Sequence, residues 1–293
     1  MFRLGAPIAA LSLSLLAVVG QAQAAPEDRD VAKLTSFGGV CANCDLAGRK
    51  LMNAKFAGAV FTKAILIGAD LRGAMFYGSN FVWSDLSRAD LRGAEMRGAN
   101  FTNANFTDAR MSGVESSGAD FSRAVLVRVD LSSAELHGVR MPGANLQSAR
   151  LPNVELIAAD LSNVNARDTD FSNADINHAN FQGGRFEGAS FRNADLTGSN
   201  LRGGVFSGAD FRNADLSLVV LSGADLSGAR GLDQDQLDEA CGDAGTRLPS
   251  GLSVRPCSGV RGTQFMLWRE MPKAPPAPPA PPAPPKAPKA PKW

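Results

Sequence analysis

The chain has 293 residues and a formal net charge of +1, with only two histidines and one tyrosine. This balance argues against a polyanionic partner and against an enzyme that attracts acidic substrates. It also leaves few side chains suited to proton-transfer chemistry.

Residues 1–25 are typical of a secretory signal peptide. An apolar run follows Arg3 as far as about Gly20, and Ala22-Gln23-Ala24 offers a small-x-small cleavage site. The alternative, a membrane anchor, is weaker because the run is shorter than the ~20 residues of a spanning helix. We expect cleavage near Ala24 or Ala25, no transmembrane segment in the mature chain, and a periplasmic or secreted protein whose cysteines pair. Residues 26–40 would form an N-terminal cap.

Large apolar residues then recur at every fifth position from Leu46 to Leu226. Of these 37 positions, 35 hold Leu, Phe, Met or Ile, and only Ser116 and Ala166 depart from the rule. The residue two places earlier is small at every step except Arg49, and 23 of these residues are alanine. A period of five fits neither a strand nor a helix, and it indicates a repeat solenoid.

The stretches GADLRGAMF and SGADLSGAR match the motif A-(D/N)-(L/F)-(S/T/R)-(X/G), so the chain resembles the pentapeptide-repeat family. The resemblance implies an all-β fold, a right-handed quadrilateral parallel β-helix with four pentapeptides per coil. Residues 41–230 would then form about nine coils, a rod ~45 Å long at ~4.8 Å per coil. The central residue and the small residue face the core, and the other three face water.

The two exceptions each have a larger residue at the small position. Val114 precedes Ser116 and Val164 precedes Ala166. We expect the valine to fill the space that the smaller central residue leaves. The alternative is a bend in the rod at these coils.

Cys41 and Cys44 form a C-x-x-C pair at the start of the repeats. In the repeat register both face the core of the first coil, which favours a structural disulfide or two buried thiols. A thioredoxin-like redox motif would need a βαβ context, and a zinc site would need two further ligands nearby.

Residues twenty apart stack vertically in a four-sided coil, and one such column is entirely acidic. We call this column the acidic ladder; its members are Glu95, Glu115, Glu135, Glu155, Asp175, Asp195 and Asp215. Neighbouring carboxylates about 5 Å apart would repel by ~0.8 kcal/mol even in water.

Arginines three residues earlier could offset this repulsion at the two ends of the ladder. The expected pairs are Arg92 with Glu95, Arg192 with Asp195, and Arg212 with Asp215. Glu115, Glu135 and Glu155 would lack such a partner, with His137 on the same face. Three interpretations remain open: an ordinary solvated column, a docking patch for a cationic partner, or a weak calcium site made of oxygen ligands.

Residues 231–271 are expected to form a C-terminal cap. Leu232, Leu237 and Ala240 have helical spacing, and Gly242 is a suitable helix stop. A helix here would cover the open edge of the last coil, which otherwise invites aggregation. A disulfide between Cys241 and Cys257 is expected, because the rod separates both from Cys41 and Cys44.

Residues 272–293 form a Pro-rich tail that cannot build a core and should be disordered, with polyproline II character. Lys273, Lys286, Lys289 and Lys292 make it cationic, and Trp293 follows them.

No nucleophile–base–orienter set is recognisable, and the two histidines, His137 and His178, both fall at outward positions. We therefore expect a non-enzymatic interaction module with no catalytic residue, cofactor or metal. Its partner would be an unknown protein or envelope component, and no nucleic acid.

Three alternatives are less favoured. One is envelope attachment through residues 262–268 and the cationic tail, and another is a ligand or enzymatic role in the caps or in residues 259–269. The third is the DNA mimicry by which known pentapeptide-repeat proteins bind gyrase. Residues 41–230 carry 20 acidic and 19 basic residues, so the polyanionic field of such mimics is missing.

Overall fold

The computed structural model describes residues 39–257. The expected signal peptide, nearly all of the N-terminal cap, residues 259–269 and the Pro-rich tail lie outside these residues. No helix in the described part is long and apolar enough to cross a membrane.

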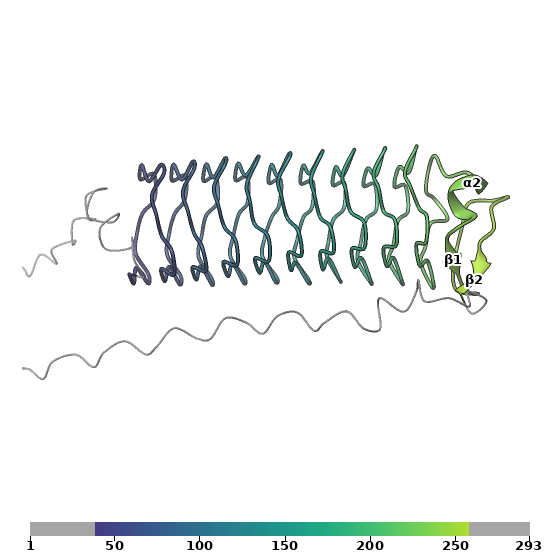
Figure 1. The fold of residues 1–293 in the computed structure, drawn as a ribbon, viewed down its shortest axis with the longest axis horizontal. Helices are drawn as coiled ribbons and strands as arrows, with labels where there is room; N and C mark the ends of the chain where they lie inside the picture. Colours follow the sequence, from purple (N-terminus) through teal and green to yellow (C-terminus); the bar gives the residue numbers. More distant parts are fainter. Residues whose placement is uncertain (1–38, 258–293) are drawn as a thin grey trace, which may run out of the picture.

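Residues 40–230 form a right-handed quadrilateral β-helix, drawn as a straight rod of stacked coils in Figure 1. At every fifth position from Val40 to Asp210, a residue makes a parallel bridge with the residue twenty positions later. A period of twenty residues means that four pentapeptides close each coil. The fold that the resemblance to the pentapeptide-repeat family implies is confirmed.

Each pentapeptide turns a corner because its backbone adopts a tight turn after the central residue. In one such turn the N–H of Ala54 donates to the carbonyl of Leu51, 3.1 Å away. The third residue of the turn has positive φ, as in Asn53 (57°) and Gly93 (65°), which is the requirement of a type II turn. Glycine and asparagine tolerate this conformation best, which explains their frequency at this position.

The core is a continuous stack of central residues along the rod axis. Phenylalanines on one wall stack ring on ring: the centroids of Phe61 and Phe81 lie 4.7 Å apart, and those of Phe81 and Phe101 lie 5.1 Å apart. The ring spacing therefore equals the rise of one coil. Small residues such as Ala64 and Ala89 are fully buried beside them.

The bridge ladder continues without interruption past Ser116 and Ala166. Val114 and Val164 are both buried beside them, as packing compensation requires. The rod shows no bend at these coils (Figure 1), so the alternative of a kink is not supported. The Ser116 Oγ is buried without a hydrogen-bond partner among the described residues.

The C-terminal cap consists of helix α2 (Gln234–Leu237) and strands β1 (Cys241–Gly242) and β2 (Arg255–Pro256), at the yellow-green end of the rod in Figure 1. Strands β1 and β2 pair in parallel. Asp233 and Gln236 form a capping box at the start of α2. Strand β1 extends one wall of the rod, because Cys241 bridges Val220.

The helix is shorter than the sequence suggested, and Gly242 is not its stop. Helix α2 ends at Leu237 with Asp238 as its C-cap, and Gly242 lies in β1. The cause is backbone pairing. The N–H of Cys241 donates to Val219 and its carbonyl accepts from Leu221, so the chain returns to the strand ladder.

Two disulfides lie at the two ends of the rod. Cys41 is bonded to Cys44 in the first coil, and Cys241 in β1 is bonded to Cys257 just after β2. Cys41 occupies a central position of the core, and Cys44 packs against that core. The described residues contain no free cysteine.

Candidate interaction face

The acidic ladder lies on one wall of the rod. Consecutive members are bridged in parallel from Glu95 to Asp215, so the seven carboxylates occupy seven successive coils. Successive rungs are therefore ~4.8 Å apart along the axis.

Aspartate and asparagine have a structural role at this position in most coils. Their Oδ1 accepts the N–H two residues later: Asn80 accepts from Val82 at 3.0 Å, and Asp85 accepts from Ser87 at 2.9 Å. This is an Asx-type turn, in which a short polar side chain caps the backbone at the corner. In the ladder, Asp195 accepts from Thr197 at 2.8 Å in this way.

The four glutamates of the ladder make no such bond. Within residues 39–257, no backbone N–H donates a hydrogen bond to the side-chain carboxylate of Glu95, Glu115, Glu135 or Glu155. A glutamate side chain is longer than an aspartate side chain by one methylene. These four carboxylates are thus free of the turn-capping role and available to other groups.

Glutamates with and without a side-chain partner alternate along the ladder. Arg97 is ion-paired with Glu115, and His137 Nε2 lies 2.6 Å from Glu155 Oε2. Glu95 and Glu135 have no ion pair with any described residue. The two unpaired glutamates are therefore two coils apart, with the paired Glu115 between them.

The expected arginine pairs are wrong, as is the expectation that all three middle glutamates lack a partner. Arg92 binds Asp90, with its Nη2 2.7 Å from Oδ2, and Arg212 binds Asp210 at 2.5 Å. Each arginine thus bonds the carboxylate two residues earlier on its own wall, and not the one three residues later across the corner. The third arginine of the expected set, Arg192, has no ion pair within the described part.

The bound arginines change the acidity of their partners. Hydrogen bonds from Arg212 lower the pKa of Asp210 to about 2, and those from Arg92 lower the pKa of Asp90. These aspartates belong to the wall next to the ladder. Arginines therefore compensate the charge of that wall at these coils, whereas in the ladder, among the described residues, an arginine compensates only Glu115.

Two further residues continue the column of the acidic ladder toward the N-terminus, and they were not identified from the sequence. Met75 bridges Glu95, and Lys55 bridges Met75, so the column continues as an apolar rung and then a basic one. Tyr77, half-buried, follows Met75 by two residues at the corner. The signal was available, because the same step of twenty residues leads from Glu95 to both positions.

The calcium interpretation finds no support in the side-chain arrangement. In residues 39–257, no group of three or more His, Cys, Asp or Glu side chains is placed to hold a metal ion. Stacked carboxylates that point away from one wall do not converge on a common point.

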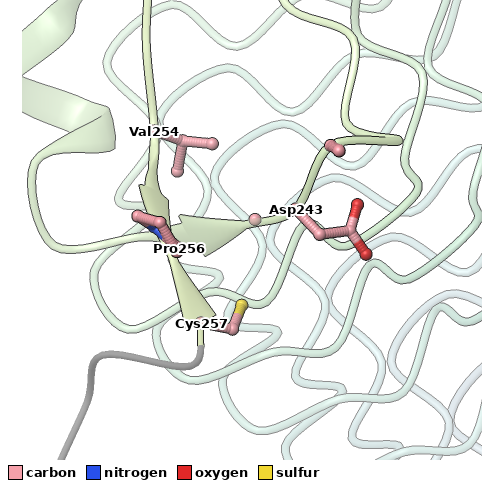
Figure 2. A pocket seen from close by; sticks show the side chains of 6 residues that line it. Asp243, Val254, Pro256 and Cys257 are labelled. Carbon is pink, nitrogen blue, oxygen red and sulfur yellow. The ribbon is translucent and has the colours of Figure 1, made fainter.

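A pocket of about 410 Å³ lies at the C-terminal cap, lined by Gly242, Asp243, Ala244, Val254, Pro256 and Cys257. Figure 2 shows the Asp243 carboxylate directed away from Val254 and Pro256. Its Oδ1 accepts the N–H groups of Gly223 and Gly245, both at 2.9 Å, and these bonds lower the pKa of Asp243. The one ionisable side chain of the lining thus closes the last coil.

Comparison with known proteins agrees with this architecture. The family model described as pentapeptide repeats matches eight copies, over residues 41–78, 54–93, 79–115, 117–153, 155–193 and 189–228. No curated protein is significantly similar to the chain.

Several solved structures are similar to it. HetL, a pentapeptide repeat protein involved in heterocyst differentiation regulation from the cyanobacterium Nostoc, is 27% identical with a TM-score of 0.54, over 63% of this chain and 84% of HetL. A pentapeptide repeat protein from the Arabidopsis thaliana thylakoid lumen is 31% identical with a TM-score of 0.28, over 32% of this chain and 69% of that one. QnrB1, a plasmid-mediated fluoroquinolone resistance protein, is 20% identical with a TM-score of 0.31, over 68% and 89% of the two chains.

Proposed function

The chain belongs to the pentapeptide-repeat family, and on that premise we propose that it is a non-enzymatic, extracytoplasmic interaction protein whose acidic ladder binds a cationic partner. The observation that carries the proposal is that Glu95 and Glu135, within an unbroken column of seven carboxylates, have no ion pair among residues 39–257.

Electrostatics support a binding role for the ladder. Each added carboxylate costs ~0.8 kcal/mol of repulsion against its neighbour in water. Among the described residues, only Glu115 has an arginine beside it, and Glu155 has the imidazole of His137. A partner that presents basic groups relieves this repulsion on binding. Such a surface confers specificity and speed of association, and its affinity falls with salt.

The rod supports such a role mechanically. Core stacking and the bridge ladder hold the rungs at a constant spacing, so an approaching partner meets a preorganised row of charges. Preorganisation lowers the conformational entropy lost on binding. HetL, the relative with the higher TM-score, is described as involved in regulation, which is consistent with an interaction role.

The two disulfides support the extracytoplasmic part of the proposal, because disulfides persist in oxidising compartments. Expression of the full sequence in a Gram-negative bacterium tests it. We expect a chain that begins after Ala24 or Ala25, released with the periplasmic fraction and with all four cysteines resistant to alkylation. An unprocessed chain in the cytosol with reactive thiols would contradict this location.

The binding test uses an oligolysine peptide titrated calorimetrically into the full chain. Substitution E95Q/E135Q/D175N should weaken binding by about tenfold, since exposed ion pairs contribute ~0.5 kcal/mol each. The control D108N/D168N/E187Q removes the same charge from another corner of the rod and should leave binding within about twofold. Equal losses in both variants would mean that net charge, and not the ladder, determines binding.

A DNA-mimicking role is not favoured. The rod carries nearly balanced charge over residues 41–230, with cations such as Arg72, Arg92 and Arg212 bound to its aspartates. Envelope attachment through the tail rests on residues outside the described part.

A further inference from the structure

The ladder offers unpaired carboxylates at a regular interval of two coils. Glu95 and Glu135 have no cation partner in the described part of the chain, and the next rung in this series is Asp175. Asn177 Nδ2 holds the Oδ1 of Asp175 at 2.6 Å, which leaves Oδ2 available. Because a coil rises ~4.8 Å, these three carboxylates are spaced by ~9.6 Å.

The chain itself carries a matching row of lysines. Residues 286–292 read KAPKAPK, with a lysine at every third position. Proline at every third position favours polyproline II, which has three residues per turn and a rise of ~3.1 Å. In that conformation the lysines would lie on one edge, ~9.3 Å apart. The two intervals differ by ~0.3 Å, well within the reach of a lysine side chain.

We propose that Lys286, Lys289 and Lys292 bind Asp175, Glu135 and Glu95 of their own chain, so that the Pro-rich tail occupies the acidic ladder. The inference rests on the proposed function in one respect: it takes the ladder as the binding face and names the occupant.

The length and direction of the chain allow this contact. The described residues end at Cys257 in the cap, about three coils or ~15 Å above Asp175 along the axis. Lys286 follows Cys257 by 29 residues, which span up to ~90 Å in polyproline II. A tail that leaves the cap and runs back along the rod meets Asp175 first and Glu95 last, which sets the order of the three pairs.

The residue after the last lysine also has a matching site. With Lys292 at Glu95, Trp293 reaches the next rung, which is Met75, bridged directly to Glu95. Tyr77 lies at the corner beside Met75, and both are half-buried. An indole ring against a thioether and a phenol ring is a favourable apolar contact. The order along the wall, three carboxylates and then Met75, thus matches the order in the tail, three lysines and then Trp293.

Occupation by the tail has a functional consequence. An external cationic partner must displace the three lysines. The tail is therefore an internal competitor that lowers the apparent affinity of the ladder for that partner. Three exposed ion pairs are each weak, and the contact is expected to open and close readily and to weaken with salt.

Carbodiimide cross-linking of the full chain, followed by mass spectrometry, tests the proposal. We expect amide cross-links within one chain that join Lys286 to Asp175, Lys289 to Glu135 and Lys292 to Glu95. Loss of the middle pair in E135Q should lower the yields of the two outer cross-links by about twofold, because one exposed pair is lost. The matched control E115Q removes a carboxylate that Arg97 already neutralises and should leave those yields unchanged.

The spacing is tested by the variant K289A/A290K, which keeps composition and charge but breaks the period of three. It should lower the outer cross-links as E135Q does. Absence of tail-to-ladder cross-links in the native chain, or equal effects of E115Q and E135Q, would overturn the proposal. Cross-links only between isotopically distinct chains would overturn it in favour of a second copy. If oligolysine still binds the ladder in those cases, the proposed function stands and only the tail contact fails.

Discussion

At the scale of single residues, Ser116 is a polar group at a central position of the core. Its column neighbours, one coil below and one above, are Met96 and Leu136, all three fully buried. Other buried hydroxyls in the rod have a bond: Ser199 Oγ donates to the Ile176 carbonyl at 2.8 Å. A buried hydroxyl without a hydrogen-bond partner costs ~1–3 kcal/mol, so Ser116 lowers the free energy of unfolding of the rod.

Substitution S116A should therefore raise the free energy of unfolding by ~1 kcal/mol, because it removes the unsatisfied group and almost no volume. Substitution S199A should lower it by a similar amount, because a satisfied hydrogen bond is lost. Urea denaturation of both variants beside the native chain measures the two effects. A loss of stability in S116A would mean that its hydroxyl is bonded in solution.

Asp210 connects stability to pH. Its side chain is largely buried and accepts from Arg212 Nε at 2.9 Å, which holds the pKa near 2 against an ordinary value of 3.8. A lowered carboxyl pKa stabilises the fold above the unfolded-state value, and the contribution is lost as pH falls toward 2.

The free energy of unfolding should fall by ~1–2 kcal/mol more in the native chain than in D210N between about pH 4 and pH 2, allowing for screening at the exposed Arg212. Thermal and urea melts across this range measure the difference. Parallel pH curves for the two proteins would contradict the assignment of the low pKa to this pair.

At the scale of elements, the cap closes the last coil through side-chain bonds. Gln236 Nε2 in α2 donates to the carbonyls of Phe211 and Ala214, at 2.9 and 2.8 Å. Leu237 is fully buried beneath them. The bond to Ala214 satisfies a carbonyl that the next coil would satisfy in mid-rod, as the N–H of Asp215 does for Ala194, and so protects an open strand edge.

Substitution Q236A should lower the free energy of unfolding by ~1–2 kcal/mol and expose the edge to association. We expect faster hydrogen exchange in residues 201–230 and a larger oligomer fraction in light scattering. Gln182 lies on the rod surface, and its side chain makes no hydrogen bond with described residues, so Q182A is the control. Identical behaviour of the two variants would show that α2 does not protect the edge.

At the scale of the whole molecule, the five-residue period predicted a repeat solenoid, and the resemblance to the pentapeptide-repeat family implied the four-sided coil. A central residue at every fifth position can face one core if the chain turns a corner once per pentapeptide. The position of the acidic ladder followed from the four-sided coil, in which residues twenty apart stack. Side-chain partners did not follow, since the period does not say whether Arg92 turns toward Asp90 or Glu95.

The limits of the period were also clear at the end of the rod. Beyond Leu226 the repeat stops, and the short length of α2 reflects competition with the strand pairing of Cys241, which no local pattern encodes. Arg97 and His137 each bond the side chain of a glutamate eighteen residues later, one coil above. A search at that spacing would have found both pairs and, with them, the alternation of the ladder.

The most direct test of the ladder as the binding face is NMR of side-chain carboxyl carbons in the full chain with K286A/K289A/K292A, which leaves the ladder vacant, on addition of oligolysine. We predict shifts concentrated at Glu95, Glu135 and the adjoining rungs, with little change at Asp168 or Glu187 on another corner. Shifts of equal size on all four walls would contradict the account, because they would mean that oligolysine follows overall charge and does not recognise the ladder.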